Sequence, residues 1–170
     1  MQNLEINNEA SQKMKVVGIS EMLLSSHKDD IIVTYALGSC LGVCVYDPAI
    51  KMGGILHCLL PLSSHNPEKA RQNPFMYVDT GITAFLDEFF MKGGMRSRMI
   101  LKVAGCGNMM DANQSFNIGQ RNFSVLRKLL WKNNILIKAE LIGGDGAKTM
   151  KLFIETGSVS IKTPTGEMQI

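Results

Sequence analysis

The sequence is poor in cysteine and in aromatic residues, and each scarcity excludes a class of protein. Four cysteines in 170 residues are too few for the disulfide framework on which small secreted domains depend. Aromatic residues make up 6% of the chain, and its net charge of +3 is not gathered into a basic run, which argues against nucleic-acid binding. We therefore expect free thiols in a reducing cytoplasm and no nucleic-acid partner.

Long hydrophobic runs are also missing. No stretch approaches the ~20 consecutive apolar residues that a helix needs to span a bilayer, and residues 1–15 hold no apolar run typical of a signal peptide. The hydrophobic content of 45% is therefore assigned to a buried core, without direct insertion into a membrane. We predict a flexible N-terminal leader over residues 1–12 and a single domain over residues 13–170.

Apolar runs separated by turn residues predict more strands than helices. Runs rich in β-branched and apolar residues are expected to form strands over residues 16–24, 31–36, 41–46, 55–60, 99–104, 136–142, 150–155 and 158–162. The last two runs are joined by Thr156-Gly157 and predict a hairpin. Apolar residues at helical spacing predict one helix from Asp79 or Thr80 to Gly93-Gly94, and a second around residues 123–130.

The balance of these elements predicts an α+β fold. Because several strands are linked as hairpins, we expect a mixed or antiparallel sheet system with the helices packed on its outside. Residues 63–74 are polar and bracketed by prolines, so they are predicted to form a long loop of the kind that often serves as a lid or binding loop. His27 and His65 lie in such polar segments and are expected to be exposed.

The candidates for chemistry lie between residues 34 and 61, which hold three of the four cysteines and one of the three histidines. Cys40 follows a Gly-Ser turn at the start of a strand, where an unpaired N–H can face a developing oxyanion. Cys44 lies in mid-strand and is expected to be an inert buried thiol. His57 is the natural base, because imidazole accepts a proton near neutral pH, and Cys58 should point to the opposite side of its strand.

Spacing alone leaves Cys40 and Cys44 as competitors for the role of nucleophile, and packing in a core is the ordinary role of such side chains. An ideal hairpin about residues 47–54 would place His57 opposite Cys44 and leave Cys40 roughly 13 Å away, at ~3.3 Å per residue. A shifted register, a bulge at Gly53-Gly54 or a fold-back of the Gly-Ser turn would instead bring Cys40 to His57.

A zinc site is an alternative use of the same side chains. Cys40 and Cys44 form C-x3-C, and His57 and Cys58 follow as H-C. Zinc sites usually pair their ligands more tightly, and adjacent residues of a strand point apart. The sequence therefore favours a free thiol over a metal centre.

Six short motifs together resemble the CheD family of chemoreceptor glutamine deamidases, over roughly residues 16–162. The motifs are Leu37-Gly38-Ser39-Cys40, Tyr46-Asp47-Pro48, Gly53-Gly54-x-x-His57, Leu60-Pro61, Ile118-Gly119-x-Arg121-Asn122 and Thr156-Gly157-x-Val159. Two segments depart from the family's pattern. The chain has Ala104-Gly105-Cys106-Gly107-Asn108-Met109 where the family commonly reads Phe-Gly-Gly-Ala before a Met, and Ala147-Lys148 where it commonly reads Gly-Arg.

The resemblance implies a cysteine hydrolase that converts receptor glutamines to glutamates with release of ammonia. It implies a mixed β-sandwich with outer helices, similar to toxin-type cysteine deamidases. By position in the motifs, Cys40 is the implied nucleophile, His57 the implied base, and Thr34, six residues before the cysteine, the residue that orients the histidine. No cofactor or metal is implied. The implied substrates are cytoplasmic portions of methyl-accepting chemoreceptors, and a CheC-type phosphatase is the implied partner.

Two other functions would use the same residues. A regulatory binding partner of a CheC-type response-regulator phosphatase requires no turnover, although a pure adaptor has no chemical need for Thr34, Cys40 and His57 together. A cysteine protease or transglutaminase would use the same nucleophile with a different leaving group or acceptor.

Overall fold

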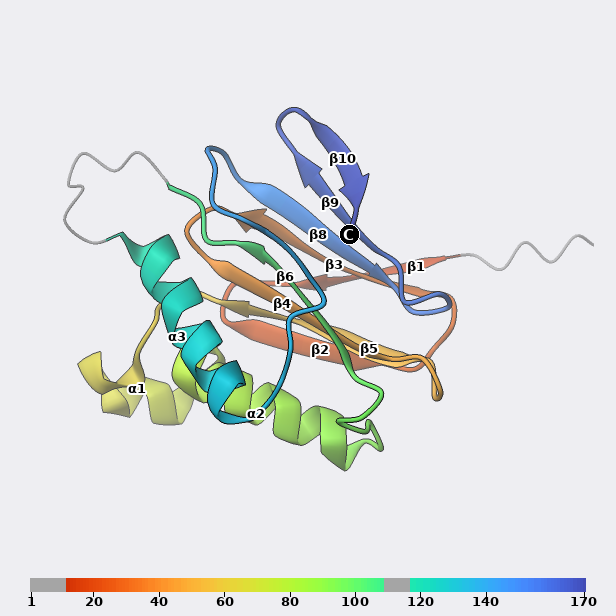
Figure 1. Ribbon diagram of the computed structural model, residues 1–170, viewed down its shortest axis with the longest axis horizontal. Coiled ribbons are helices and arrows are strands. Elements are labelled where there is room, and N and C mark those ends of the chain that lie inside the picture. Colours follow the sequence, from red (N-terminus) through yellow and green to blue (C-terminus); the bar gives the residue numbers. More distant parts are fainter. Residues whose placement is uncertain (1–11, 109–116) are drawn as a thin grey trace, which may run out of the picture.

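In a computed structural model, which describes residues 12–108 and 117–170, these residues form two five-stranded sheets that pack face to face (Figure 1). The first sheet contains, in spatial order, β1 (Lys13–Val17), β3 (Asp30–Leu37), β8 (Lys148–Phe153), β9 (Val159–Thr163) and β10 (Gly166–Gln169). The second sheet contains β2 (Glu21–Ser25), β5 (Met52–Cys58), β4 (Leu41–Asp47), β6 (Ile100–Gly105) and β7 (Ala139–Ile142). Both sheets are mixed, because β1 runs parallel to β3 and β6 parallel to β7.

The space between the sheets is filled by apolar side chains from both. Every residue of β4 and β5 is buried, because one face of these strands meets the first sheet and the other meets the helices. Alternate residues therefore enter two separate cores. The core between the sheets joins Ile32, Leu37, Met150, Leu152 and Ile161 of the first sheet to Cys44, Tyr46, Ile55 and Ala104 of the second.

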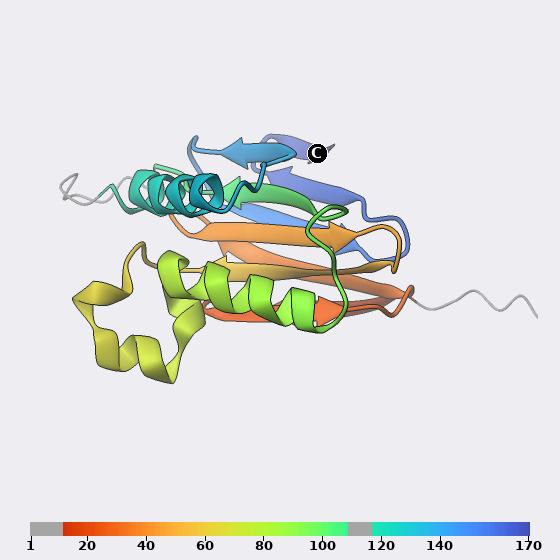
Figure 2. The ribbon, with the colours of Figure 1, turned by 60° about the horizontal axis from the view of Figure 1, so that its bottom comes forward.

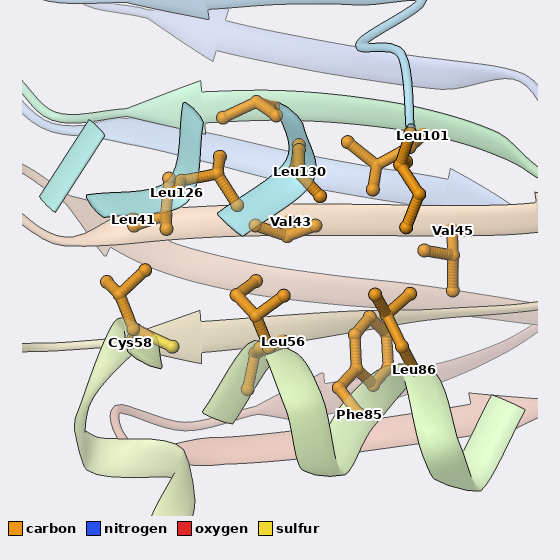
Figure 3. Packing of buried hydrophobic residues seen from close by; sticks show 14 of the residues in the cluster. Leu41, Val43, Val45, Leu56, Cys58, Phe85, Leu86, Leu101, Leu126 and Leu130 are labelled. Atoms are coloured by element: carbon orange, nitrogen blue, oxygen red, sulfur yellow. The ribbon is translucent and has the colours of Figure 1, made fainter. Parts of the chain in front are cut away.

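The outer face of the second sheet is covered by α2 (Val78–Met91) and α3 (Ile118–Lys132) (Figure 2). Leucine and valine side chains of β4 and β5 pack there against one buried stripe of each helix (Figure 3). The helix α2 ends where Gly93 adopts a φ of 97°, a left-handed conformation that glycine tolerates best. The α+β class and the sheet sandwich with outer helices are thus confirmed.

Most of the predicted elements are confirmed within a few residues. The runs at residues 31–36, 41–46 and 99–104 form β3, β4 and β6, and the predicted hairpin is formed by β8 and β9. The strand predicted over residues 136–142 is shorter, since β7 begins at Ala139.

The local structure differs from the prediction in four places. The run at residues 16–24 is not one strand: it breaks at Ser20, whose φ is 62°, and its halves enter different sheets as β1 and β2. Residues 63–74 contain the short helix α1 (Pro67–Gln72) between the 3-10 turns η1 (Ser63–His65) and η2 (Pro74–Met76). The strand β10 was not predicted, and β5 begins three residues earlier than expected, at Met52.

Residues 1–11, which make up almost all of the predicted leader, and residues 109–116 lie outside the described residues. The division into a leader and one domain stays a prediction. Within the described part of the chain, no helix is both long and apolar enough to cross a membrane.

Candidate active site

The register of the β4–β5 hairpin determines which cysteine lies near His57. In the structure His57 pairs with Gly42, and Cys44 pairs with Ile55. Cys40 lies two residues before Gly42 and belongs, like Cys44, to the core between the sheets, so it is on the same face as His57. Diagonal neighbours of this kind have Cα atoms about 7–8 Å apart, with Cβ atoms somewhat closer. Of the three arrangements considered from the sequence, the structure contains the shifted register.

The register is shifted because Gly53 and Gly54 lie inside β5 instead of forming the turn. A Cβ atom at Gly54 would lie 2.2 Å from the carbonyl oxygen of Leu23 in β2, and one at Gly53 would lie 2.6 Å from that of Val45 in β4. Only glycine allows β5 to pass this close to both neighbours. The turn is therefore confined to the residues between Asp47 and Met52, which pair with each other.

Thr34 of the first sheet and His57 of the second meet between the sheets, and both are fully buried. The Thr34 hydroxyl lies 2.8 Å from Nδ1 of His57 and donates its proton to the carbonyl of Val17, also at 2.8 Å. A hydroxyl has only one proton, so Oγ1 of Thr34 accepts from an Nδ1–H group. The other nitrogen, Nε2, is then the unprotonated one, and it has no hydrogen-bond partner among the described residues.

A bulge after Thr34 turns the chain from the first sheet towards the second. The β3–β8 register shifts between Thr34 and Leu37, and Ala36 takes a φ of 57°. The N–H of Gly38 then donates to the carbonyl of Ala36 at 2.9 Å. Bulges of this kind re-aim side chains next to active sites. Here the bulge places Cys40 directly before the first residue of β4, which pairs with the strand that carries His57.

The end of β6 holds the backbone on either side of Cys40. The N–H of Cys106 donates to the carbonyl of Cys40 at 2.8 Å, and that of Gly107 donates to the carbonyl of Gly38 at 2.7 Å. At Gly105 the φ is 101°, and a Cβ atom there would lie 2.2 Å from the carbonyl oxygen of Cys40. This segment is one of the two that depart from the CheD pattern, so the departure lies directly against the candidate nucleophile.

Burial keeps the candidate pair neutral at rest. It raises the pKa of the Cys40 thiol above its ordinary value of 9.0, an effect that the backbone N–H of Cys40 itself opposes. Burial also lowers the pKa of His57 to about 4. At neutral pH both the Cys40 thiol and the His57 imidazole are therefore neutral in the resting protein.

The other thiols of the hairpin differ in surroundings, as the sequence predicts. Burial raises the pKa of Cys44 to about 12, so this thiol stays protonated at neutral pH. Cys58 lies on the helix-facing side of β5 (Figure 3), where its thiol contacts the carbonyl of Tyr77 at 3.6 Å. His57, its neighbour in the strand, points to the opposite side. His27 and His65 are exposed. Among the described residues, no three histidine, cysteine or carboxylate side chains are grouped as metal ligands.

Asn122 of α3 is a further residue at this site, and the sequence identified it only as part of a motif. Its side chain is fully buried, and Nδ2 donates to the carbonyl of Ser39 at 3.0 Å and to that of Leu59 at 3.1 Å. It is spaced by four from Leu126 and by eight from Leu130, both of which are buried on α3. A polar residue on the apolar stripe of a helix was the signal that could have found it.

Comparison with known proteins identifies the family. A family model described as "CheD chemotactic sensory transduction" matches residues 59–163. The probable chemoreceptor glutamine deamidase CheD 1 of Syntrophus aciditrophicus is 43% identical over 154 residues, which are 91% of this chain and 96% of the relative. The chain belongs to the CheD family.

Other CheD relatives are similar over most of their length. The probable chemoreceptor glutamine deamidase CheD of Solibacter usitatus is 41% identical and covers 84% of each chain. That of Pyrococcus horikoshii is 37% identical over 88% of this chain and 91% of its own. Among solved structures, the Bacillus licheniformis hypothetical protein YfiH matches with a TM-score of 0.44 at 14% identity, over 71% of this chain and 49% of that one.

Proposed function

We propose that this CheD chain deamidates glutamine side chains of chemoreceptors, with Cys40 as nucleophile, His57 as general base and Thr34 as the residue that orients His57. One observation carries the proposal: Thr34 holds the Nδ1–H of His57, while the basic Nε2 is buried without a partner among the described residues. This histidine shares a face of the hairpin with Cys40. The names of the curated CheD relatives support the substrate.

The reaction begins with proton transfer from the thiol of Cys40 to Nε2 of His57. The thiolate attacks the carbon of the glutamine carboxamide, and a C–S bond forms as the C=O π electrons move to oxygen. Backbone N–H groups near Ser39 and Cys40 stabilise this oxyanion. The imidazolium then gives its proton to the amide nitrogen, the C–N bond breaks and ammonia leaves, so that a thioester remains on Cys40.

Hydrolysis of the thioester completes the cycle. His57 removes a proton from a water molecule, whose oxygen attacks the thioester carbon. The C–S bond breaks, the thiolate of Cys40 recovers its proton from the imidazolium, and glutamate remains on the receptor. Whenever the imidazolium of His57 forms, the Thr34 oxygen accepts from its Nδ1–H, and the negative charge of the thiolate or the oxyanion attracts it. Coulomb attraction of this kind is strong in a buried site.

The proposal is tested with cytoplasmic fragments of methyl-accepting chemoreceptors. We expect wild-type protein to release ammonia and to leave the small mass increase of amide-to-acid conversion at specific glutamines, and we expect Cys40→Ala to abolish both. Cys44→Ala is the matched control, because Cys44 is a buried thiol of β4, four residues after Cys40. If Cys44→Ala were inactive in a folded protein and Cys40→Ala active, the assignment would be wrong. Chain cleavage or amine incorporation instead of ammonia release would indicate a protease or a transglutaminase.

Membership of the CheD family also supports a cytoplasmic location and a regulatory partner, a CheC-type phosphatase. Binding of a purified CheC-type phosphatase, measured by calorimetry, tests the partner. Because Cys40→Ala removes only the thiol, we expect this variant to bind the phosphatase like the wild type, which separates the regulatory role from turnover. Absence of heat with both proteins would contradict the partnership.

A further inference from the structure

Asn122 connects the two chain segments that carry the candidate catalytic pair without belonging to either. One of its acceptors, the carbonyl of Ser39, immediately precedes Cys40. The other, the carbonyl of Leu59, lies two residues beyond His57, just past the end of β5. A single amide group of α3 therefore holds the start of β4 and the end of β5 together.

The bond to Ser39 also fixes the direction of the Cys40 N–H. In a trans peptide unit the carbonyl of one residue and the N–H of the next point in opposite directions within one plane. Among the described residues, the Cys40 N–H makes no backbone hydrogen bond to another residue. The hydrogen bond from Asn122 to the Ser39 carbonyl thus determines the direction of the Cys40 N–H.

Packing alone does not account for an asparagine at this position. Its Oδ1 is buried and has no partner among the described residues, and an unsatisfied buried oxygen is unfavourable. A leucine would fill similar space without that cost. An amide NH2 supplies two donors at once, which a hydroxyl or an ionised carboxylate does not. The side chain is thus suited to holding two carbonyls.

A glycine one turn earlier brings α3 close enough for this contact. A Cβ atom at Gly119 would lie 2.6 Å from the carbonyl oxygen of Gly107 and 2.7 Å from the carbonyl carbon of Cys106. Gly119 and Asn122 are three apart, so they lie on neighbouring parts of one helix face. The approach of the helix and the double hydrogen bond are features of the same contact.

We propose that Asn122 is a positioning residue, which holds Cys40 and His57 at their working separation and aims the Cys40 N–H at the oxyanion. Its effect on ammonia release rests on the proposed function, but its effect on the thiol does not. Loss of the two Asn122 hydrogen bonds allows Cys40 and His57 to move apart. A displacement near 1 Å at a reacting centre lowers the rate about 10²-fold.

The test uses Asn122→Leu, with Leu126→Ala as a matched control. Leu126 is equally buried on the same helix, and its apolar side chain cannot donate a hydrogen bond to either carbonyl. For Asn122→Leu we expect kcat to fall about 10²-fold with little change in KM, and the rate of Cys40 alkylation by iodoacetamide, followed by peptide mass mapping, to fall as well. For Leu126→Ala we expect a lower unfolding midpoint but wild-type kcat and alkylation rate.

An isosteric variant, Asn122→Asp, covers the case in which leucine prevents folding. A protonated aspartate donates one hydrogen bond, whereas an ionised one donates none. We therefore expect the alkylation rate of Asn122→Asp, relative to wild type at each pH, to fall as the pH rises. A pH-independent ratio near one would overturn the proposal.

Two further outcomes are decisive. The proposal is wrong if folded Asn122→Leu keeps the wild-type kcat and alkylation rate, or if Leu126→Ala loses as much of both. If the wild type releases no ammonia from receptor fragments but Asn122→Leu still slows alkylation of Cys40, the positioning role stands and the deamidase function fails.

Discussion

Replacement of Thr34 by valine removes the hydroxyl that holds His57 while keeping the shape of the side chain. Two buried groups lose their partner: the Nδ1–H of His57 and, at least in part, the carbonyl of Val17. Each buried polar group left without a partner costs about 1–3 kcal/mol, so we expect the free energy of unfolding to fall by about 2–6 kcal/mol.

The same change removes the control over which nitrogen of His57 carries the proton. If the proton moves to Nε2, the imidazole no longer accepts the Cys40 proton, and the contribution of general base catalysis is lost. That contribution is typically about 10²–10⁴-fold, so we expect a fall of this size in the kcat of Thr34→Val. The initial rate of ammonia release from a receptor fragment measures it, and urea unfolding measures the stability.

Thr34→Ser is the matched control for this experiment, because serine keeps the hydroxyl and loses only a methyl group. We expect it to keep most of the activity, with a modest loss of stability. The reasoning would be refuted by a folded Thr34→Val protein that turns over at the wild-type rate. It would also be refuted if Thr34→Ser lost as much activity as Thr34→Val, since the methyl group would then be what matters.

Two further predictions concern pH and backbone geometry. Because burial lowers the pKa of His57 from its ordinary 6.5 to about 4, the base stays neutral well below pH 6.5, and we expect kcat/KM to fall on the acid side near pH 4. The unfolded chain binds this proton below pH 6.5 and the folded protein only near pH 4, so His57 contributes stability that is complete above pH 6.5 and is lost as the pH falls towards 4. This loss in the free energy of unfolding amounts to about 3 kcal/mol. Urea unfolding of His57→Gln at a series of pH values should not show it. An equal dependence of the unfolding free energy on pH in that variant would contradict the assignment. For Gly105→Ala we expect severe loss of both stability and turnover, because the φ of Gly105 is 101° and a Cβ atom would collide with the carbonyl of Cys40. Gly143→Ala is the control, because Gly143 has a φ of 72° and nothing within 4 Å of an added Cβ atom. We expect this control to lower the free energy of unfolding by only about 1–2 kcal/mol, measured by thermal or urea unfolding. Equal effects of the two substitutions would show that the close approach to Cys40 is unimportant.

Local patterns in the sequence predict most elements of this fold because each pattern reflects which face of an element is buried. The helices α2 and α3 follow from apolar residues at helical spacing, and the strands β3, β4 and β6 follow from runs of β-branched and apolar residues. The break at Ser20 does not, because a left-handed φ such as its 62° is uncommon for a serine. The short helix α1 had a signal that was not used: Asn66 followed by Pro67 is a helix cap and first residue, and the Asn66 side chain accepts from the N–H of Lys69.

The arrangement of the site depends on contacts that periodicity does not encode. Thr34 and His57 lie on different sheets, and no local pattern states which sheet a strand will join. The position of Cys40 relative to His57 depends on Gly53-Gly54, a pair that also suits a turn and here allows close strand packing instead. Local patterns alone therefore do not distinguish Cys40 from Cys44 as the nucleophile, and only the family resemblance favours Cys40.

The central claim, that Cys40 carries the acyl group during glutamine deamidation, is tested most directly by trapping the intermediate. Wild-type protein mixed with a receptor fragment is quenched with acid during turnover, and its peptides are mapped by mass spectrometry. We predict a receptor fragment attached through a thioester to Cys40, and none on Cys40→Ala. A thioester on another cysteine, or deamidation of the receptor by Cys40→Ala, would contradict the account.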